Sequence, residues 1–160
     1  MSKLVNGLIL FSLISIVSCT ENRYFEANHD FAEKVWMMDE EVDFTFNVDE
    51  SEALYQVYIN IRNDMDYSYR NLYIHYTLVD STDNILDKKL QDIQLFEAKT
   101  GAPYGDNVSN IYSHQVLLED SVTFPYEGDY TVKYKQYMRT DSLQGIYSTG
   151  LRIKKIDPAE

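Results

Sequence analysis

The chain has 160 residues, with 14 Lys or Arg against 26 Asp or Glu, so its formal net charge is −12. This acidity argues against nucleic-acid binding, which needs a basic surface to displace counterions, and against docking on anionic lipid by charge. A hydrophobic content of 44% is enough for one packed domain, and 14 Tyr against 6 Gly and 3 Pro favour β-structure. A single Cys excludes an intrachain disulfide and a Cys-cluster metal site.

The N-terminal residues are typical of a targeting segment. Lys3 precedes a mostly apolar run, 4–17, which is shorter than the roughly 20 residues of a membrane-spanning helix and fits a secretory signal. The only Cys ends this segment, in Ile16-Val17-Ser18-Cys19, which resembles the bacterial lipobox, although that pattern prefers Leu where this chain has Ile16. The resemblance implies that 1–18 is a lipoprotein signal peptide and that Cys19 becomes the acylated (for example palmitoylated) first residue. An ordinary signal peptide with an incidental Cys is the alternative.

The residues after Cys19 are predicted to be a polar tether. We expect 19–38 to hold the lipidated Cys and this tether, and 39–160 to form one domain. Within the tether, 25–36 is the likeliest place for a short helix or an edge strand.

Seven stretches of the remaining chain are predicted to be strands. Apolar residues alternate with polar ones in 42–48, where Val42, Phe44, Phe46 and Val48 share one face. Turn residues separate the stretches. The predicted strands are 42–48, 54–62, 72–79, 85–97, 111–118, 130–138 and 146–156.

This spacing of short strands predicts an all-β fold, an antiparallel, immunoglobulin-like β-sandwich of about seven to eight strands. Phe124-Pro125, Gly128 and Tyr130 resemble a tyrosine corner, in which a Tyr at the start of a late strand bonds to nearby backbone. A plain loop followed by a packed Tyr is the alternative.

Residues for chemistry are sparse. His29, His75 and His114 have no short ligand spacing, and Asp64 and Asp66 lack the Gly and distal Glu of a calcium loop. No nucleophile elbow, zinc-protease motif or phosphate loop is present. We therefore predict no catalytic residue, no metal site, no small-molecule cofactor and no enzymatic activity.

The connection between the last two predicted strands is a candidate partner surface. It carries Arg139, Asp141, Leu143 and Tyr147, where a simple hairpin would need only two polar residues. Loops on rigid scaffolds carry recognition, and Arg and aromatic residues are favoured anchors. Alternatively, Arg139 and Asp141 pair across the turn while Leu143 and Ile146 fold back over the open end of the sandwich.

Three Asp-Ser pairs resemble the periplasmic O-glycosylation acceptor of the Bacteroidetes. They place the candidate acceptors at Ser81, Ser121 and Ser142. A glycan needs an exposed loop, which favours Ser81. Chance is the alternative for so short a pattern.

Several longer motifs resemble one family over nearly the whole chain after Cys19. The most specific is Met138-Arg139-x-Asp141-x-Leu143-x-Gly145-Ile146, supported by the runs at 58–63, 71–73, 101–105 and 124–130. They are similar to the gliding-motility lipoprotein H (GldH) family of the Bacteroidetes.

The resemblance implies a lipid-anchored protein of the cell envelope that is needed for gliding, with no catalytic residues to carry over. Its expected partners are the membrane, through the lipid anchor, and other gliding and type-9-secretion proteins, and its expected orientation is toward the periplasm. A carbohydrate-binding lipoprotein of a polysaccharide-uptake system is the alternative. That alternative needs two or three aromatic side chains exposed on one face.

Overall fold

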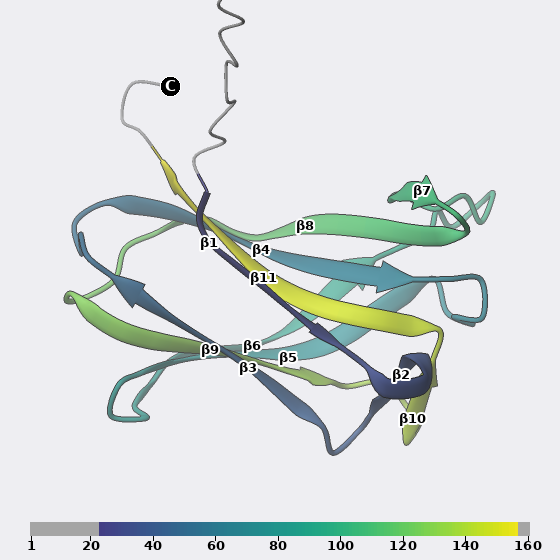
Figure 1. Ribbon diagram of the computed structural model, residues 1–160, viewed down its shortest axis with the longest axis horizontal. Helices are drawn as coiled ribbons and strands as arrows, with labels where there is room; N and C mark the ends of the chain where they lie inside the picture. The colour runs from purple at the N-terminus through teal and green to yellow at the C-terminus, as the bar shows by residue number, and fades with distance from the viewer. Residues whose placement is uncertain (1–22, 157–160) are drawn as a thin grey trace, which may run out of the picture.

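The computed structural model describes residues 23–156, which fold as two facing antiparallel sheets (Figure 1). The predicted signal peptide 1–18 and Cys19 lie outside the described residues. The described part contains eleven strands and one short 3-10 turn, η1 (Ala32–Lys34). The first sheet has the order β1 (Arg23–Asp30), β11 (Ile146–Ile156), β4 (Leu54–Asn63), β8 (Ile111–Val122) and β7 (Asp106–Val108). The second has the order β3 (Glu41–Val48), β9 (Gly128–Gln136), β5 (Asn71–Asp80) and β6 (Ile85–Gln94).

The core lies between the two sheets and follows from the alternation in the sequence. Successive side chains of a strand point to opposite faces, so one set of alternate residues is buried. In β3 the buried set is Val42, Phe44, Phe46 and Val48, as predicted. The corresponding residues of β9, from Tyr130 to Gln136, are also buried. The all-β antiparallel sandwich is confirmed, and the seven predicted strands match its seven long strands from β3 onward.

The tyrosine corner is present. The Tyr130 hydroxyl donates to the carbonyl oxygen of Tyr126 at 2.6 Å and accepts from the backbone N–H of the same residue at 3.2 Å. Tyr130 exposes no surface, and its ring packs on Phe124 with centroids 4.7 Å apart. The corner therefore fixes the entry of the chain into β9 and satisfies a hydroxyl that would otherwise be buried without a partner.

The predicted tether 19–38 is too long at its C-terminal end. From Arg23 onward this segment belongs to the domain, because β1 pairs with β11 along the edge of the first sheet. Phe31 and Trp36 are buried, and their rings stack with centroids 4.8 Å apart. Arg23, one of the polar residues that suggest a tether, is exposed at the start of this edge strand.

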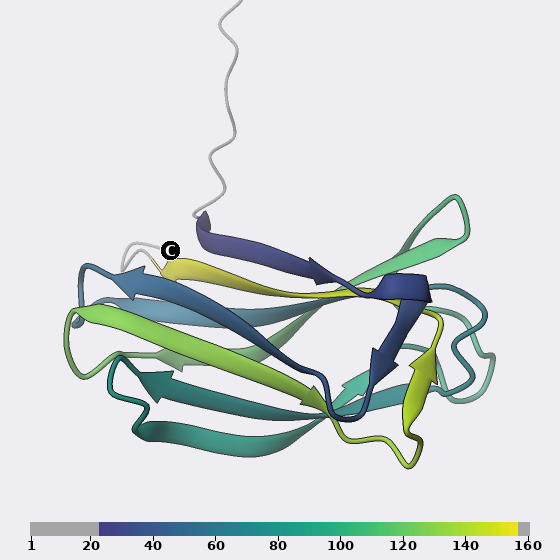
Figure 2. The same ribbon diagram turned by 60° about the horizontal axis from the view of Figure 1, so that its bottom comes forward.

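A small third sheet closes one end of the sandwich. It pairs β2 (Val35–Met37) with β10 (Ser142–Gln144), with Trp36 opposite Leu143. Figure 2 shows these two short strands running between the two layers at the right-hand end. The long connection after β9 is therefore structural in part, because it supplies the strand that covers the core there.

Candidate functional site

The outer face of the second sheet carries a hollow of about 1040 Å³ that we call the tyrosine pocket. Tyr73 on β5, Tyr69 before it and Tyr137 after β9 line it, with exposed fractions of 36%, 42% and 58%. Met38 and Leu90 add exposed apolar surface. Figure 2 brings the layer that carries this face to the front. Pockets lined by aromatic and apolar side chains with a few polar groups are the usual sites of binding.

Strand register explains why these residues meet. His75 of β5 lies opposite Lys135 of β9 and Leu90 of β6, and the next outward position of β5 is Tyr73. The backbone N–H of Tyr137 donates to the carbonyl oxygen of Tyr73 at 2.8 Å, which holds the chain after β9 beside β5. Tyr73, His75 and Lys135 therefore stand on paired strands, which position side chains more rigidly than a free loop does. Tyr69, Tyr137 and Arg139 lie in the segments next to these strands.

The pocket is cationic in an acidic protein. Lys135 and Arg139 line it, and no Asp or Glu does. Neither cation forms an ion pair with a carboxylate in residues 23–156, whereas Lys34, Lys89, Lys133 and other basic residues do. Glu41 of β3 lies opposite Lys135 in register but forms its ion pair with Lys133, so Lys135 and Arg139 remain able to bind an anionic ligand.

His75 forms one wall of the pocket. Its ring packs edge-on against Tyr137, with centroids 4.3 Å apart. Its Nδ1 atom is shielded from solvent and has no hydrogen-bond partner among the described residues. Tyr73 and His75 occupy alternate outward positions of β5, but nothing in the sequence signals that Tyr69 and Tyr137 join them.

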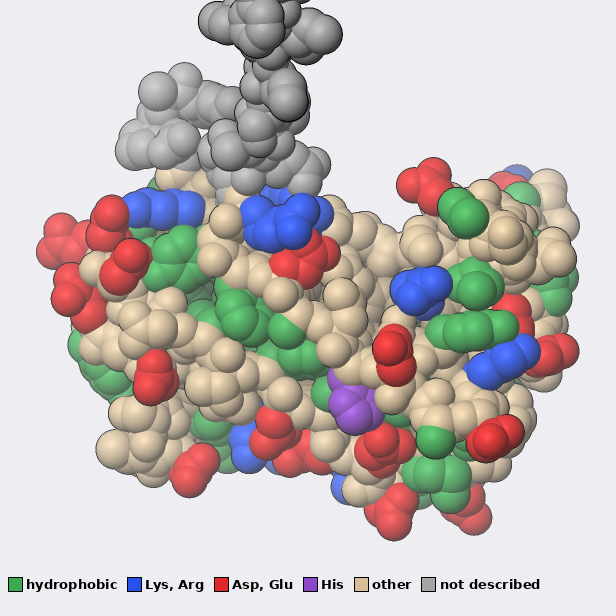
Figure 3. All heavy atoms as spheres, viewed as in Figure 1, with side chains coloured by type: hydrophobic (Ala, Val, Ile, Leu, Met, Phe, Trp, Pro, Cys, Tyr) green, Lys and Arg blue, Asp and Glu red, His purple; other side chains and the backbone are tan. Residues whose placement is uncertain are grey.

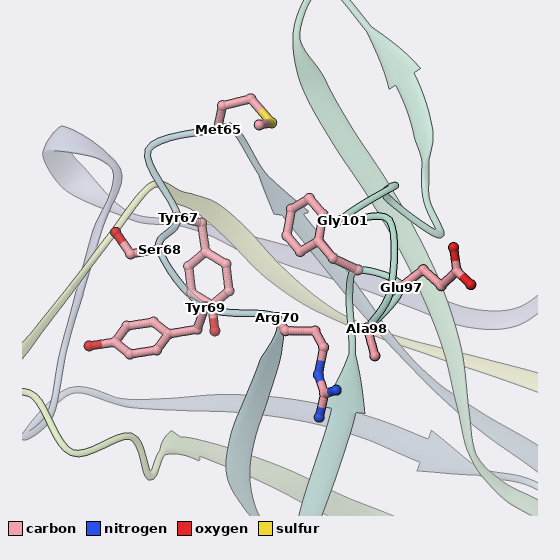
Figure 4. A pocket seen from close by; sticks show the side chains of 9 residues that line it. Met65, Tyr67, Ser68, Tyr69, Arg70, Glu97, Ala98 and Gly101 are labelled. Carbon is pink, nitrogen blue, oxygen red and sulfur yellow. The ribbon is translucent and has the colours of Figure 1, made fainter.

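A smaller hollow of about 270 Å³ adjoins the tyrosine pocket through Tyr69, which lines both (Figure 4). It lies between the loop that enters β5 and the loop that follows β6. The carbonyl oxygen of Arg70 accepts from the backbone N–H groups of Leu95 and Phe96, both at 3.0 Å, and this joins the two loops. Unlike the tyrosine pocket, this hollow is lined by one cation, Arg70, and one carboxylate, Glu97.

The predicted partner residues do not form one surface. Arg139 and Asp141 are exposed, and Arg139 lines the tyrosine pocket. Leu143 is completely buried, so its prediction as a contact residue is wrong, because β10 turns it into the core. Tyr147 is half-buried, and Lys34 Nζ lies 4.9 Å from its ring centroid. Leu143 and Ile146 are both buried, as the alternative expects, whereas no ion pair joins Arg139 and Asp141 within residues 23–156.

The three candidate glycosylation residues differ in exposure. Ser81 is exposed in the turn between β5 and β6, Ser121 is exposed near the end of β8, and Ser142 is half-buried in β10. Asp80, beside Ser81, accepts hydrogen bonds from Thr82 and Asn84. The Tyr126 hydroxyl, which donates to Asp80, holds the pKa of that carboxyl well below its usual range. This turn is therefore ordered, and the glycosylation of Ser81 stays a prediction.

The remaining polar residues show no assembled metal centre. Residues 23–156 hold no group of three or more His, Asp or Glu side chains that could bind a metal ion. Asp64 instead binds Lys34, with Oδ2 2.9 Å from Nζ. Burial lowers the pKa of His114 to about 4. No helix within the same residues is long and apolar enough to cross a membrane.

A polar hollow lies on the opposite face, over β1, β4 and β8. Gln115 donates to Asn60 at 3.2 Å, and Asn60 donates to Glu26 at 3.1 Å. Glu26 also contacts Arg23 at 3.1 Å. Figure 3 shows acidic side chains scattered over the view that contains β1 and β11, with few basic ones between them. Asn60, Gln115 and Glu26 bond to one another here, whereas Nε2 of His114, which also lines the hollow, is buried without a hydrogen-bond partner among the described residues.

Comparison with known proteins gives one family. The family model described as GldH lipoprotein matches residues 23–153. A gliding motility lipoprotein GldH homolog from Christiangramia forsetii is 26% identical over 94% of this chain and 94% of its own length. The gliding motility lipoprotein GldH of Flavobacterium johnsoniae is 24% identical over 95% of this chain and 97% of its own. Among solved structures, the VP2 subviral particle of infectious bursal disease virus has 8% identity and a TM-score of 0.36, covering 81% of this chain and 30% of that one, which is too low to indicate a shared fold.

Proposed function

The chain belongs to the GldH lipoprotein family, and we propose that it acts as a lipid-anchored, non-catalytic interaction component of the gliding-motility apparatus, associated with type-9 secretion, on the periplasmic side of the envelope. The observation that carries the proposal is the match to two gliding-motility lipoproteins. These matches cover 94% and 95% of this chain and almost the whole length of each relative. A match over nearly the full length of both proteins favours a shared role for the whole chain.

The proposed anchor is Cys19, and the fold sets how far the domain can lie from it. Only four residue steps separate Cys19 from Arg23, where β1 begins. An extended chain advances at most about 3.6 Å per residue, so the start of β1 would lie within about 14 Å of the lipidated residue. Two acyl chains are sufficient for stable anchoring. The domain would therefore work close to the membrane surface.

Co-purification tests the proposed interaction role. The full chain, carrying an affinity tag and extracted from membranes with detergent, should bring down other gliding or secretion envelope proteins. The Cys19→Ala variant, expressed at the same level, is the control for contacts that need the anchor. Recovery of polysaccharide-uptake transporters or hydrolases in place of motility proteins would contradict the proposal.

One observation favours the second candidate function, a carbohydrate-binding lipoprotein of a polysaccharide-uptake system. The exposed rings of Tyr69, Tyr73 and Tyr137 line the same hollow, which meets the requirement for two or three aromatic side chains on one face. The other lining residues weigh against it, because Lys135 and Arg139 are cationic and no carboxylate lies among them.

A further inference from the structure

We infer that the tyrosine pocket is a docking site for an acidic, partly apolar peptide segment of a partner protein. The inference rests on the proposed role as an interaction component and adds the surface and the chemistry of the partner. Tyr69, Tyr73 and Tyr137 supply aromatic contact area, and Lys135 and Arg139 supply positive charge. Tyr, Met and Arg are the residue types enriched in protein interfaces, and Tyr and Arg are frequent hot spots.

The hydrogen-bonding groups of the pocket favour a peptide over a neutral glycan as its ligand. Sugar hydroxyls donate as well as accept, so a sugar site offers acceptors such as carboxylates or free amide oxygens. The tyrosine pocket is lined by no carboxylate, and its one amide is occupied. Gln136 Nε2 donates to the carbonyl oxygen of Thr140 at 3.1 Å, and Gln136 Oε1 accepts from the backbone N–H of Met138 at 2.8 Å. The tyrosine hydroxyls of the pocket can donate or accept, but its two charged groups, Lys135 and Arg139, only donate, and this suits a ligand that brings carboxylates.

The apolar side chains that line the pocket favour a peptide over an acidic glycan as its ligand. Leu90 and Met38 are exposed by 49% and 37% within the pocket, and a polyhydroxylated chain would cover them without an apolar partner. An aliphatic or aromatic side chain of a peptide would bury this surface, which is favourable by about 25 cal/mol per Å². Carboxylates on either side of that side chain would reach Lys135 and Arg139. Charge and apolarity together therefore favour a peptide.

The position of the pocket leaves it accessible in an anchored protein. The pocket lies on the outer face of the β3-β9-β5-β6 sheet, whereas β1, which continues from the proposed anchor, belongs to the other sheet (Figures 1 and 2). A partner can thus approach this face while the opposite layer carries the link to the membrane.

Selection of peptides on the intact protein tests the inference. The full chain in detergent is immobilised, and phage-displayed random peptides are selected for binding to the wild type and against binding to the Tyr137→Ser/Arg139→Glu double variant. Both residues are exposed, so the variant should keep its circular dichroism spectrum and melting temperature. The matched control is Tyr104→Ser/Lys99→Glu, which changes an exposed Tyr and an exposed cation outside the pocket.

The selected peptides should carry carboxylates next to an apolar side chain. Their dissociation constants, measured by fluorescence anisotropy, should rise at least about tenfold in the double variant and stay unchanged in the control, as for the loss of hot-spot residues. Failure to select any peptide that distinguishes the two proteins, or selection of basic peptides, would overturn the inference. So would binding of polygalacturonate, an acidic polysaccharide, to the wild type and not to the double variant.

A gliding assay distinguishes a failure of this inference from a failure of the proposed function. If deletion of the gene stops gliding while the double variant restores it fully, the proposed function holds and the docking site is wrong. If deletion leaves gliding unchanged, the proposed function fails, and selected peptides would then identify a partner outside the motility apparatus.

Discussion

Trp36 and Leu143 lie opposite each other in register across β2 and β10, and neither side chain exposes any surface to solvent. Trp36 also donates from Nε1 to the carbonyl oxygen of Glu40 at 3.0 Å, so its one polar atom is satisfied. The pair joins the segment before β3 to the connection after β9. It closes the end of the sandwich next to the tyrosine pocket, which Met38 and Arg139 reach from those same two segments.

Leu143→Ala should destabilise the protein by about 2–5 kcal/mol, because the truncation removes buried contacts and leaves a cavity beside Trp36. Chemical denaturation followed by tryptophan fluorescence measures this directly, since Trp36 is the only Trp in the chain. Gln144→Ala, at an exposed position of the same strand, is the control and should change the unfolding free energy by no more than about 0.5 kcal/mol. Equal stability of the two variants would show that β10 does not close the core.

Tyr130→Phe should lower the unfolding free energy by about 0.5–1.5 kcal/mol, because the carbonyl oxygen and N–H of Tyr126 lose their hydroxyl partner while the ring still fills its site. The exposed Tyr104→Phe serves as the comparison and should be neutral. Melting temperatures of the two variants and the wild type are sufficient to test this. A neutral Tyr130→Phe would mean that the corner contributes packing only.

His114 should make the fold less stable in mild acid. Burial holds the pKa of His114 at about 4, below the roughly 6.5 of an unfolded chain, so the neutral form is favoured in the fold. As the pH falls from 6.5 toward 4, the unfolded chain binds a proton that the folded chain excludes, and stability is lost across that window. Below pH 4 both states are protonated and no further loss comes from this group.

Substitution isolates this effect from other titrations. The decrease in unfolding free energy between pH 6.5 and pH 4 should be smaller in His114→Leu than in the wild type by an amount on the order of 1–3 kcal/mol. Denaturant titrations at a series of pH values measure both slopes. Parallel curves for the two proteins would contradict the assignment.

Cys19→Ala should abolish labelling by a fatty-acid analogue and release the domain from the membrane fraction. The reason is that the acyl chains, each contributing about 0.8 kcal/mol per buried methylene, supply the proposed attachment. Metabolic labelling and fractionation of cells expressing either form measure the two effects. An unlabelled wild type, together with unchanged fractionation of the variant, would refute lipidation.

The long strands could be predicted because their burial is periodic. In β3, β5 and β9 every second residue faces the core, so the sequence alternates, and Tyr130 is marked by the Pro and Gly before it. β1 gives no such signal in the sequence, because its burial shows no period of two. It is an edge strand whose side chains are mostly half-exposed or exposed, which leaves no apolar pattern to detect.

The candidate site was harder to predict, since it depends on pairing between distant strands. Nothing local to Tyr69, Tyr73 or Tyr137 indicates that they meet, because their proximity comes from the register of β5 with β9. The prediction for Leu143 is wrong for a related reason. An apolar residue in a connection can anchor a partner or cover the core, and only the pairing of β10 with β2 separates the two.

Single-cell gliding tests the central claim most directly. Speeds on glass are measured for the parent strain, a deletion strain, and the deletion strain carrying the wild-type gene at its native level. The account predicts that the deletion strain stops gliding and that the wild-type gene restores the parental speed. Deletion cells that glide as fast as the parent would contradict a role for this lipoprotein in motility.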